Sequence, residues 1–167
     1  MPAPSVIGIA QKIGRAAADL IWPPQCLVSR QVVGAPGAVA HEHWTDLTFI
    51  DAPVCARCGS PFAADIGEDA VCAPCVARPP TFDRARAALA YSDAAGRMLV
   101  QFKWGDRFDG VATFAAWMAR AGHGLIAECD LLVPVPLHFT RFVMRHFNQS
   151  ALLAEALQRD LGAGQLE

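Results

Sequence analysis

The sequence predicts an α/β protein in which a small cysteine-rich domain precedes a parallel sheet with flanking helices. Two observations predict this class. Residues 23–80 are rich in proline, glycine and cysteine and keep no sustained period of 3.6 or 2, so they need a covalent or metal cross-link to hold them. After residue 80, alanine-rich stretches of helical period alternate with short apolar runs, as is typical of an α/β domain.

The composition is that of an ordinary globular protein. The chain has 167 residues, of which 53% are hydrophobic and 18% are charged, and its net charge is −2. These values exclude an intrinsically disordered chain. A near-neutral charge also counts against strong nonspecific binding of nucleic acid, so any basic surface has to be local.

Residues 1–22 are expected to form a separate N-terminal element. Apolar residues recur at helical spacing between residues 5 and 22, which predicts an amphipathic helix that ends before Pro23-Pro24. Charged side chains interrupt this stretch: Lys12, Arg15 and Asp19. We therefore expect no stable membrane insertion, although a helix lying on a membrane surface is an alternative. No export signal is recognisable, so a cytoplasmic location is expected.

Four cysteines form two C-x-x-C pairs, Cys55 with Cys58 and Cys72 with Cys75. Each pair can present two thiolates from one tight turn, and two such turns complete the tetrahedral shell that zinc prefers. Gly59 follows the first pair, where the turn needs a positive φ. Two redox-active or disulfide-bonded pairs are the alternative. A closed Cys₄ shell leaves no open coordination position, so the zinc is expected to be structural.

A second, less regular group lies upstream. Cys26, His41 and His43 carry ligand types that zinc accepts, but only three are visible and their spacing is irregular. They form either a degenerate zinc site or a buried thiol with surface histidines. Cys129 opens an apolar run and is expected in the core.

Residues 81–167 are predicted to form the α/β domain. Helices are expected over residues 94–104, 109–124 and 150–162, with Asn148 or Ser150 as N-cap of the last one. A short strand is expected at the end of residues 84–93. The run CDLLVPVPL, residues 129–137, is almost wholly apolar and is expected to be a buried parallel strand.

Motifs spread over most of the chain resemble the ComF family of competence-associated proteins. Each motif is weak alone, but their order is specific. The motifs are Pro24-Gln25-Cys26, WTDLTFI (44–50), PVCARCGSP (53–61), CAPC (72–75), Ala90-Tyr91, Phe102-Lys103, VPVPL (133–137) and RHFNQ (145–149).

The resemblance implies a double zinc ribbon followed by a type I phosphoribosyltransferase-like parallel sheet, incomplete in this chain. It also implies a role in DNA uptake and the handling of single-stranded DNA. The pyrophosphate of phosphoribosyl pyrophosphate (PRPP) would meet the loop after VPVPL. The phosphate or nucleic-acid contacts it implies are Arg141, Arg145, Lys103 and Asn148.

The sequence departs from the family pattern in three places. Ser29, Ala40 and His43 stand where the upstream ribbon usually has cysteines, and His146 replaces a glycine. No acidic pair followed by a Thr-Gly phosphate loop occurs before residue 167, so PRPP binding is expected only in a longer chain.

Three functions follow as hypotheses. The first is a ComF-like zinc-ribbon module that binds single-stranded DNA or a DNA-processing protein. The second is a PRPP-dependent phosphoribosyltransferase whose PRPP loop lies beyond residue 167. The third is a structural zinc-ribbon adaptor that recognises protein.

Overall fold

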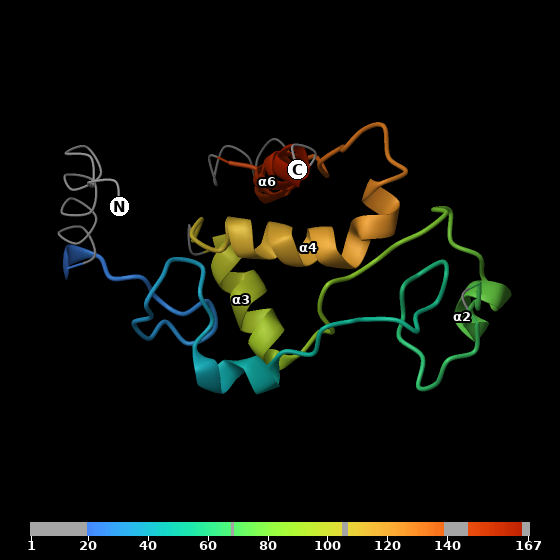
Figure 1. Cartoon of the computed structure of the whole chain (residues 1–167), viewed down its shortest axis with the longest axis horizontal. Coiled ribbons are helices and arrows are strands. Elements are labelled where there is room, and N and C mark those ends of the chain that lie inside the picture. Colours follow the sequence, from blue (N-terminus) through green and yellow to red (C-terminus); the bar gives the residue numbers. More distant parts are fainter. Residues whose placement is uncertain (1–19, 68, 105–106, 139–146, 165–167) are drawn as a thin grey trace, which may run out of the picture.

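The computed structural model describes residues 20–67, 69–104, 107–138 and 147–164. Figure 1 shows the long helices of the C-terminal half gathered at one part of the molecule, with the segment around residues 53–77 at the far end. The elements in chain order are η1 (His41–Asp46), α2 (Ala73–Ala77), α3 (Asp93–Trp104), α4 (Val111–Ile126) and α6 (Gln149–Gly164).

Helix α3 confirms the helix expected over residues 94–104. Its N-terminus is fixed by Ser92, whose Oγ accepts a hydrogen bond of 3.2 Å from the amide of Ala95. Ala94, Met98 and Phe102 follow at intervals of four residues and are all buried. The apolar face that the sequence predicts is therefore the face that packs in the core.

Helices α4 and α6 pack against each other and confirm the other two expected helices. Gly122 and Gly124 do not end α4, which continues to Ile126, because glycine inside a helix costs only about 1 kcal/mol relative to alanine. The Oδ1 atom of Asn148 accepts a 2.9 Å hydrogen bond from the amide of Ser150. Asn148 is therefore the N-cap of α6, one of the two candidates that the sequence offers, whereas Ser150 lies inside the helix.

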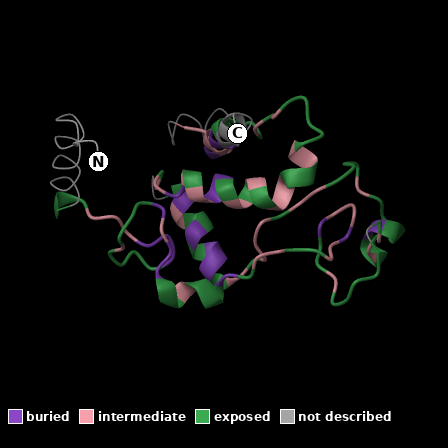
Figure 2. Ribbon diagram, viewed as in Figure 1, coloured by how far each residue is buried: buried purple, intermediate pink, exposed green. Residues whose placement is uncertain are grey.

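The largest buried cluster joins the segment from Cys26 to Leu47 to the helices α3 and α4. Figure 2 shows buried residues concentrated there, whereas the far loop around α2 is mostly exposed or intermediate. The buried members of this cluster are Cys26, Leu27, Val28, Val39, Ala40, Leu47, Ala94, Met98, Phe102 and Phe114. The cysteine-rich region therefore supplies six of the ten buried residues of this core, and the helices α3 and α4 supply the other four.

The predicted parallel sheet is wrong for the part of the chain that is described. In the described part of the chain, strand pairing is limited to three isolated antiparallel bridges: Gln25 with Val32, Phe49 with Leu89, and Val54 with Pro61. The segment expected as a strand at the end of residues 84–93 forms only the bridge at Leu89. The described residues thus give helices and ribbon loops, not a phosphoribosyltransferase-like α/β sheet.

The run at residues 129–137 has no regular secondary structure and is not a buried strand. Leu131, Val133 and Val135 are exposed to 75%, 74% and 71%, whereas Leu132 packs on the cluster between α4 and α6. Only one face of the run is covered, and Pro134 and Pro136 provide no amide for strand pairing. A continuous apolar run is typical of a strand that is buried on both faces, and the described part of this fold places no second layer over the exposed face of residues 129–137.

Two further expectations concern single segments. Cys129 is exposed, contrary to the expected core position, and lies just beyond the end of α4. Most of the expected N-terminal helix lies outside the described residues. In the described ranges, no helix is both long enough and apolar enough to cross a membrane.

Candidate metal centre and apolar groove

The two C-x-x-C pairs come together in the loop that ends in α2. The four sulfur atoms of Cys55, Cys58, Cys72 and Cys75 lie within 4.8 Å of one another, and those of Cys58 and Cys72 are 3.6 Å apart. A tetrahedral zinc with Zn–S bonds of about 2.3 Å places its sulfurs about 3.8 Å apart. The arrangement therefore fits zinc, and among the described residues it is the one such group of His, Cys, Asp and Glu ligands.

Local backbone geometry explains why the first pair converges. The amide of Gly59 donates to the carbonyl of Cys55 at 3.0 Å, which closes the turn between the two thiols. Gly59 has a φ of +73°, a left-handed conformation that costs other residues about 1 kcal/mol. A Cβ at this position would also meet the carbonyl oxygen of Ala85 at 2.7 Å. Glycine is therefore required by both conformation and space.

The second pair is positioned by the start of a helix. Cys72 is the N-cap of α2, and Pro74 lies in its first turn. The amide of Cys75 donates to the carbonyl of Cys72 at 2.9 Å, so this pair also encloses a tight turn. The amide of Cys72 donates to the sulfur of Cys55 at 3.3 Å, which links the two turns.

The electrostatics of the four thiols are unequal. The amide hydrogen bond from Cys72 lowers the pKa of Cys55 to about 6. Contacts with Ser60, first through its side chain and then its amide, also lower the pKa of Cys58. Burial and the neighbouring cysteine sulfurs raise the pKa of Cys75 to about 12. Without a cation, sulfurs this close cannot all ionise, and a divalent metal removes that repulsion.

Arg86 connects this site to the chain that follows it. Its Nη1 atom donates to the carbonyls of Ala56, at 3.1 Å, and Cys55, at 3.4 Å. The amide of Ala85 donates to the carbonyl of Arg57 at 2.7 Å. These bonds attach the metal loop to the segment leading into α3, and the sequence gives no signal for Arg86.

The upstream group of predicted ligands is arranged differently. Cys26 is fully buried in the main core, whereas His41 and His43 lie on the short helix η1. The Nδ1 atom of His43 is 3.1 Å from Asp46 Oδ2, and His41 is exposed. A second metal site at these residues stays a prediction.

The predicted phosphate contacts are only partly described. Arg141 and Arg145 lie outside the described residues. Lys103 lies in the last turn of α3, and its carbonyl accepts a 3.0 Å hydrogen bond from Gln149 Nε2. Asn148 caps α6 and also donates from Nδ2 to the carbonyl of Val135 at 3.1 Å. Lys103 and Asn148 both line the same groove, described next.

This apolar groove lies between α3, α4 and α6 and has a volume of about 530 Å³. Its walls include Leu99 and Trp117, together with the segments 88–91 and 135–137. The sequence does not predict a binding groove here, because apolar residues at these positions are expected to be buried in the core. Their partial exposure depends on how the helices are spaced, which no local pattern reveals.

Comparison with known proteins bears on the ribbon region. Residues 17–77 match the family model of the double zinc ribbon domain. No curated protein and no solved structure matches this chain. The match and the geometry of the four cysteines together identify residues 17–77 as a double zinc ribbon domain whose Cys55, Cys58, Cys72 and Cys75 hold a structural zinc ion.

Proposed function

We propose that this chain is a ComF-like zinc-ribbon binding module that serves DNA uptake by docking a DNA-processing protein in the apolar groove. A zinc ribbon is suited to metal binding and to recognition of nucleic acid or protein. The closed Cys₄ shell favours a supporting role for the metal, so recognition has to come from another surface. The groove between α3, α4 and α6 is the observation that carries the proposal.

The groove is continuous with exposed apolar side chains. Tyr91, Leu99 and Val135 line it and are also exposed, and Leu131 and Val133 extend the same segment beyond Val135. A contiguous apolar surface of this kind usually marks an interaction site, because water contact with it is unfavourable. Burying it against a partner would supply the main favourable term of binding.

The backbone beside the groove favours an extended peptide as the bound segment. Ala90 donates to Thr48, and Ile50 donates to Ala88, so one edge of segment 88–91 is paired. In an antiparallel pair, the residue between two hydrogen-bonded residues of a strand directs its amide and carbonyl groups away from the paired strand. Leu89 therefore presents a peptide edge to which another strand can add, with apolar pockets for alternate side chains.

Direct binding of single-stranded DNA is the second candidate. It is favoured by one observation, that Lys103 and the exposed ring of Tyr91 line the same groove, where they could meet a phosphate and a base. Several other cations of the described part are held in ion pairs and contribute less: Arg84 with Glu128, Arg107 with Asp109, Arg120 with Asp51, and Arg159 with Glu155.

A photo-crosslinking amino acid placed at Tyr91 tests the protein-docking proposal in cells of the source organism. The same amino acid at Val76, an exposed apolar position on α2, is the matched control. We expect adducts with proteins that process single-stranded DNA from position 91 and not from position 76. Val135→Asp should abolish them, since a carboxylate in the groove opposes apolar burial.

Two other outcomes would contradict the docking proposal. Adducts that consist only of a second copy of this chain would make the groove a self-association surface. Equal yields of adduct from positions 91 and 76 would show that the groove does not bind DNA-processing proteins in preference to the rest of the surface. A fluorescence anisotropy titration with labelled single-stranded DNA separates the second candidate. Binding that weakens with salt and with Lys103→Ala or Arg141→Ala/Arg145→Ala supports DNA recognition, and unmeasurable binding excludes it.

A further inference from the structure

The two halves of the ribbon region repeat the same hydrogen-bond pattern. Each half begins with a Pro-x-Cys turn, and the second follows the first by 29 residues. The bond from Cys26 N to Gln31 O matches the bond from Cys55 N to Ser60 O. The bond from Arg30 N to Cys26 O matches that from Gly59 N to Cys55 O. The bond from Val33 N to Pro24 O matches that from Phe62 N to Pro53 O. Arg30 even has the left-handed φ of Gly59, +65° against +73°.

The repeat continues at the second turn of each half. The amide of Ala40 donates to the sulfur of Cys26 at 3.2 Å, as the amide of Cys72 donates to the sulfur of Cys55 at 3.3 Å. The amide of His43 then donates to the carbonyl of Ala40, as that of Cys75 donates to Cys72. The backbone thus places Cys26, Ser29, Ala40 and His43 at the four ligand positions occupied in the second half by Cys55, Cys58, Cys72 and Cys75.

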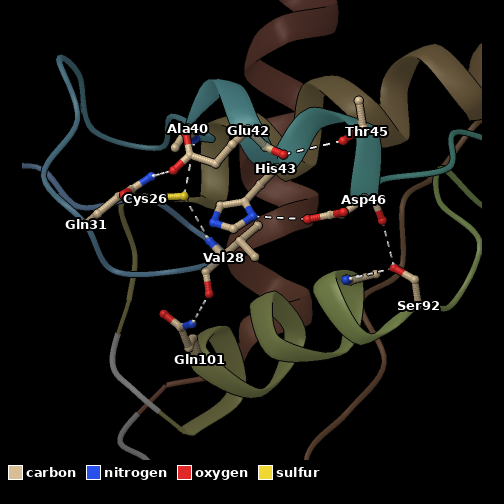
Figure 3. A network of polar contacts seen from close by, with 11 residues as sticks. Cys26, Val28, Gln31, Ala40, Glu42, His43, Thr45, Asp46, Ser92 and Gln101 are labelled. Atoms are coloured by element: carbon tan, nitrogen blue, oxygen red, sulfur yellow. Dashed lines mark hydrogen bonds and ion pairs between the residues drawn. The ribbon is translucent and has the colours of Figure 1, made fainter.

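These four residues do not fit a zinc ion. Ala40 has no ligand atom, and Ser29 offers only a hydroxyl, which is not among the usual zinc ligands. Figure 3 shows the sulfur of Cys26 bonded to the amides of Val28 and Ala40, and the ring of His43 turned to Asp46. One thiol and one imidazole leave the four-ligand shell of a structural zinc half empty.

The first half has another source of stability. Cys26, Leu27, Val28, Val39, Ala40 and Leu47 are buried against α3 and α4. Polar contacts add to this packing. Gln101 Nε2 donates to Val28 at 3.2 Å, Arg107 Nη2 donates to Gln25 at 2.8 Å, and Thr113 Oγ1 donates to Gly37 at 2.8 Å. The first half is therefore fixed by the helices without needing a metal.

The second half lacks such a core. Among the described residues between 53 and 77, the buried ones are Cys55, Gly59 and Cys75, so burial there centres on the metal site itself. A segment without an apolar core folds only with another cross-link, and metal binding then supplies its folding free energy. The same backbone pattern is thus stabilised in two different ways.

We propose that this chain binds one zinc ion, at Cys55, Cys58, Cys72 and Cys75, and that its first ribbon is a metal-independent copy held by the hydrophobic core. The double zinc ribbon match implies two metal sites, and the residues present at the first do not support one. This inference does not depend on what the groove binds. Zinc removal is then a local event that unfolds residues 53–77 and leaves residues 24–50 in place.

Metal counting on the full chain tests the proposal. Inductively coupled plasma mass spectrometry should find about one zinc per chain, unchanged in His43→Gln. Cys75→Ser, the matched position of the second ribbon, should lower the count toward zero. Cys26 is fully buried and its replacement can unfold the chain, so His43→Gln is the decisive variant. About two zinc ions in the parent chain, falling to one in His43→Gln, would overturn the proposal.

Rebuilding the first site tests the repeat directly. Ser29→Cys with Ala40→Cys, together with Cys26 and His43, restores three thiols and an imidazole. We expect the count to rise from about one to about two, with helical content checked by circular dichroism. A folded double variant that still binds a single zinc would contradict the inferred ligand positions.

Hydrogen exchange after chelation tests the independence of the two halves. Chelation should speed exchange at the amides of Cys55 and Phe62 by at least about tenfold, because their bonds belong to the metal loop. The matching amides of Cys26 and Val33 should change by less than about twofold. Equal loss of protection in both halves would contradict a metal-independent first ribbon.

Discussion

The backbone amide of Cys72 donates a hydrogen bond of 3.3 Å to the sulfur of Cys55, seventeen residues earlier in the chain. This bond sets the second C-x-x-C turn against the first, so that all four sulfurs face one point. It also lowers the pKa of Cys55 to about 6, which favours the thiolate that zinc requires. One contact thus contributes to both the shape and the charge of the site.

Loss of one ligand should release the metal. Cys58→Ser removes a thiolate from the closed shell. Loss of a residue that only hydrogen-bonds to a metal ligand lowers metal affinity by about 10- to 100-fold, so we expect loss of a ligand itself to lower zinc affinity by more than that. A competition titration with a chromophoric zinc chelator measures the change. Cys129→Ser, at an exposed cysteine away from the site, is the control and should retain the parent affinity.

Zinc binding should release protons at pH 7. An amide hydrogen bond from Cys75 lowers the pKa of Cys72, but burial and contacts with Cys58 and Cys55 outweigh it, and the pKa of Cys72 is raised above its ordinary value. With Cys75 raised to about 12, both thiols are protonated at pH 7 when no metal is bound, whereas Cys55 at about 6 is mostly ionised. Both protons must leave when zinc binds.

Affinity should therefore rise with pH and fall on acidification, since protons compete for the same sulfurs. Calorimetry in buffers of different ionisation enthalpy should report at least about two protons released per zinc at pH 7. Release of less than one proton would show that the thiols are already ionised in the metal-free chain.

Met98 should be a major contributor to folding stability. It is 2% exposed at the centre of the cluster that joins the first ribbon to α3 and α4. Met98→Ala should lower the free energy of unfolding by about 2–5 kcal/mol through lost burial and a residual cavity. Val100→Ala on the same helix, at a site 56% exposed, should cost less than about 0.5 kcal/mol. Urea denaturation measures the free energy of unfolding of both variants. Equal losses in Met98→Ala and Val100→Ala would contradict the position of Met98 in the core.

Gly59 should not tolerate a side chain. Gly59→Ala imposes a left-handed φ on alanine and brings its Cβ to 2.7 Å from the carbonyl of Ala85. We expect a loss of at least about 1 kcal/mol and weaker zinc retention. Gly124→Ala, inside α4 with nothing within 4 Å of the new Cβ, should instead be neutral or stabilising by up to about 1 kcal/mol. Thermal unfolding of the two variants gives the comparison.

The features that the sequence predicted correctly are local ones. The metal quartet depends on two short C-x-x-C spacings, and α3, α4 and α6 depend on apolar periods within a dozen or so residues. The Asn148 cap depends on one side chain reaching an amide two residues later. Each of these is decided by near neighbours in the chain, so a sequence pattern contains the information needed.

The features that it predicted wrongly depend on distant parts of the chain. Residues 129–137 have the composition of a buried strand, but burial needs neighbours on both faces and edges, and Leu131 and Val133 have none that cover them. The contact between Arg84 and Glu128 joins positions 44 residues apart, with no signal in either segment. The groove beside Tyr91 likewise arises only when three helices pack.

The central claim is that four thiolates of the second ribbon hold the structural zinc of this chain. Extended X-ray absorption at the zinc edge of the purified full chain tests it most directly. The account predicts a single shell of four sulfur atoms at about 2.3 Å and no nitrogen. A shell that mixes sulfur with nitrogen at about 2.0–2.1 Å would place histidine on zinc and contradict it.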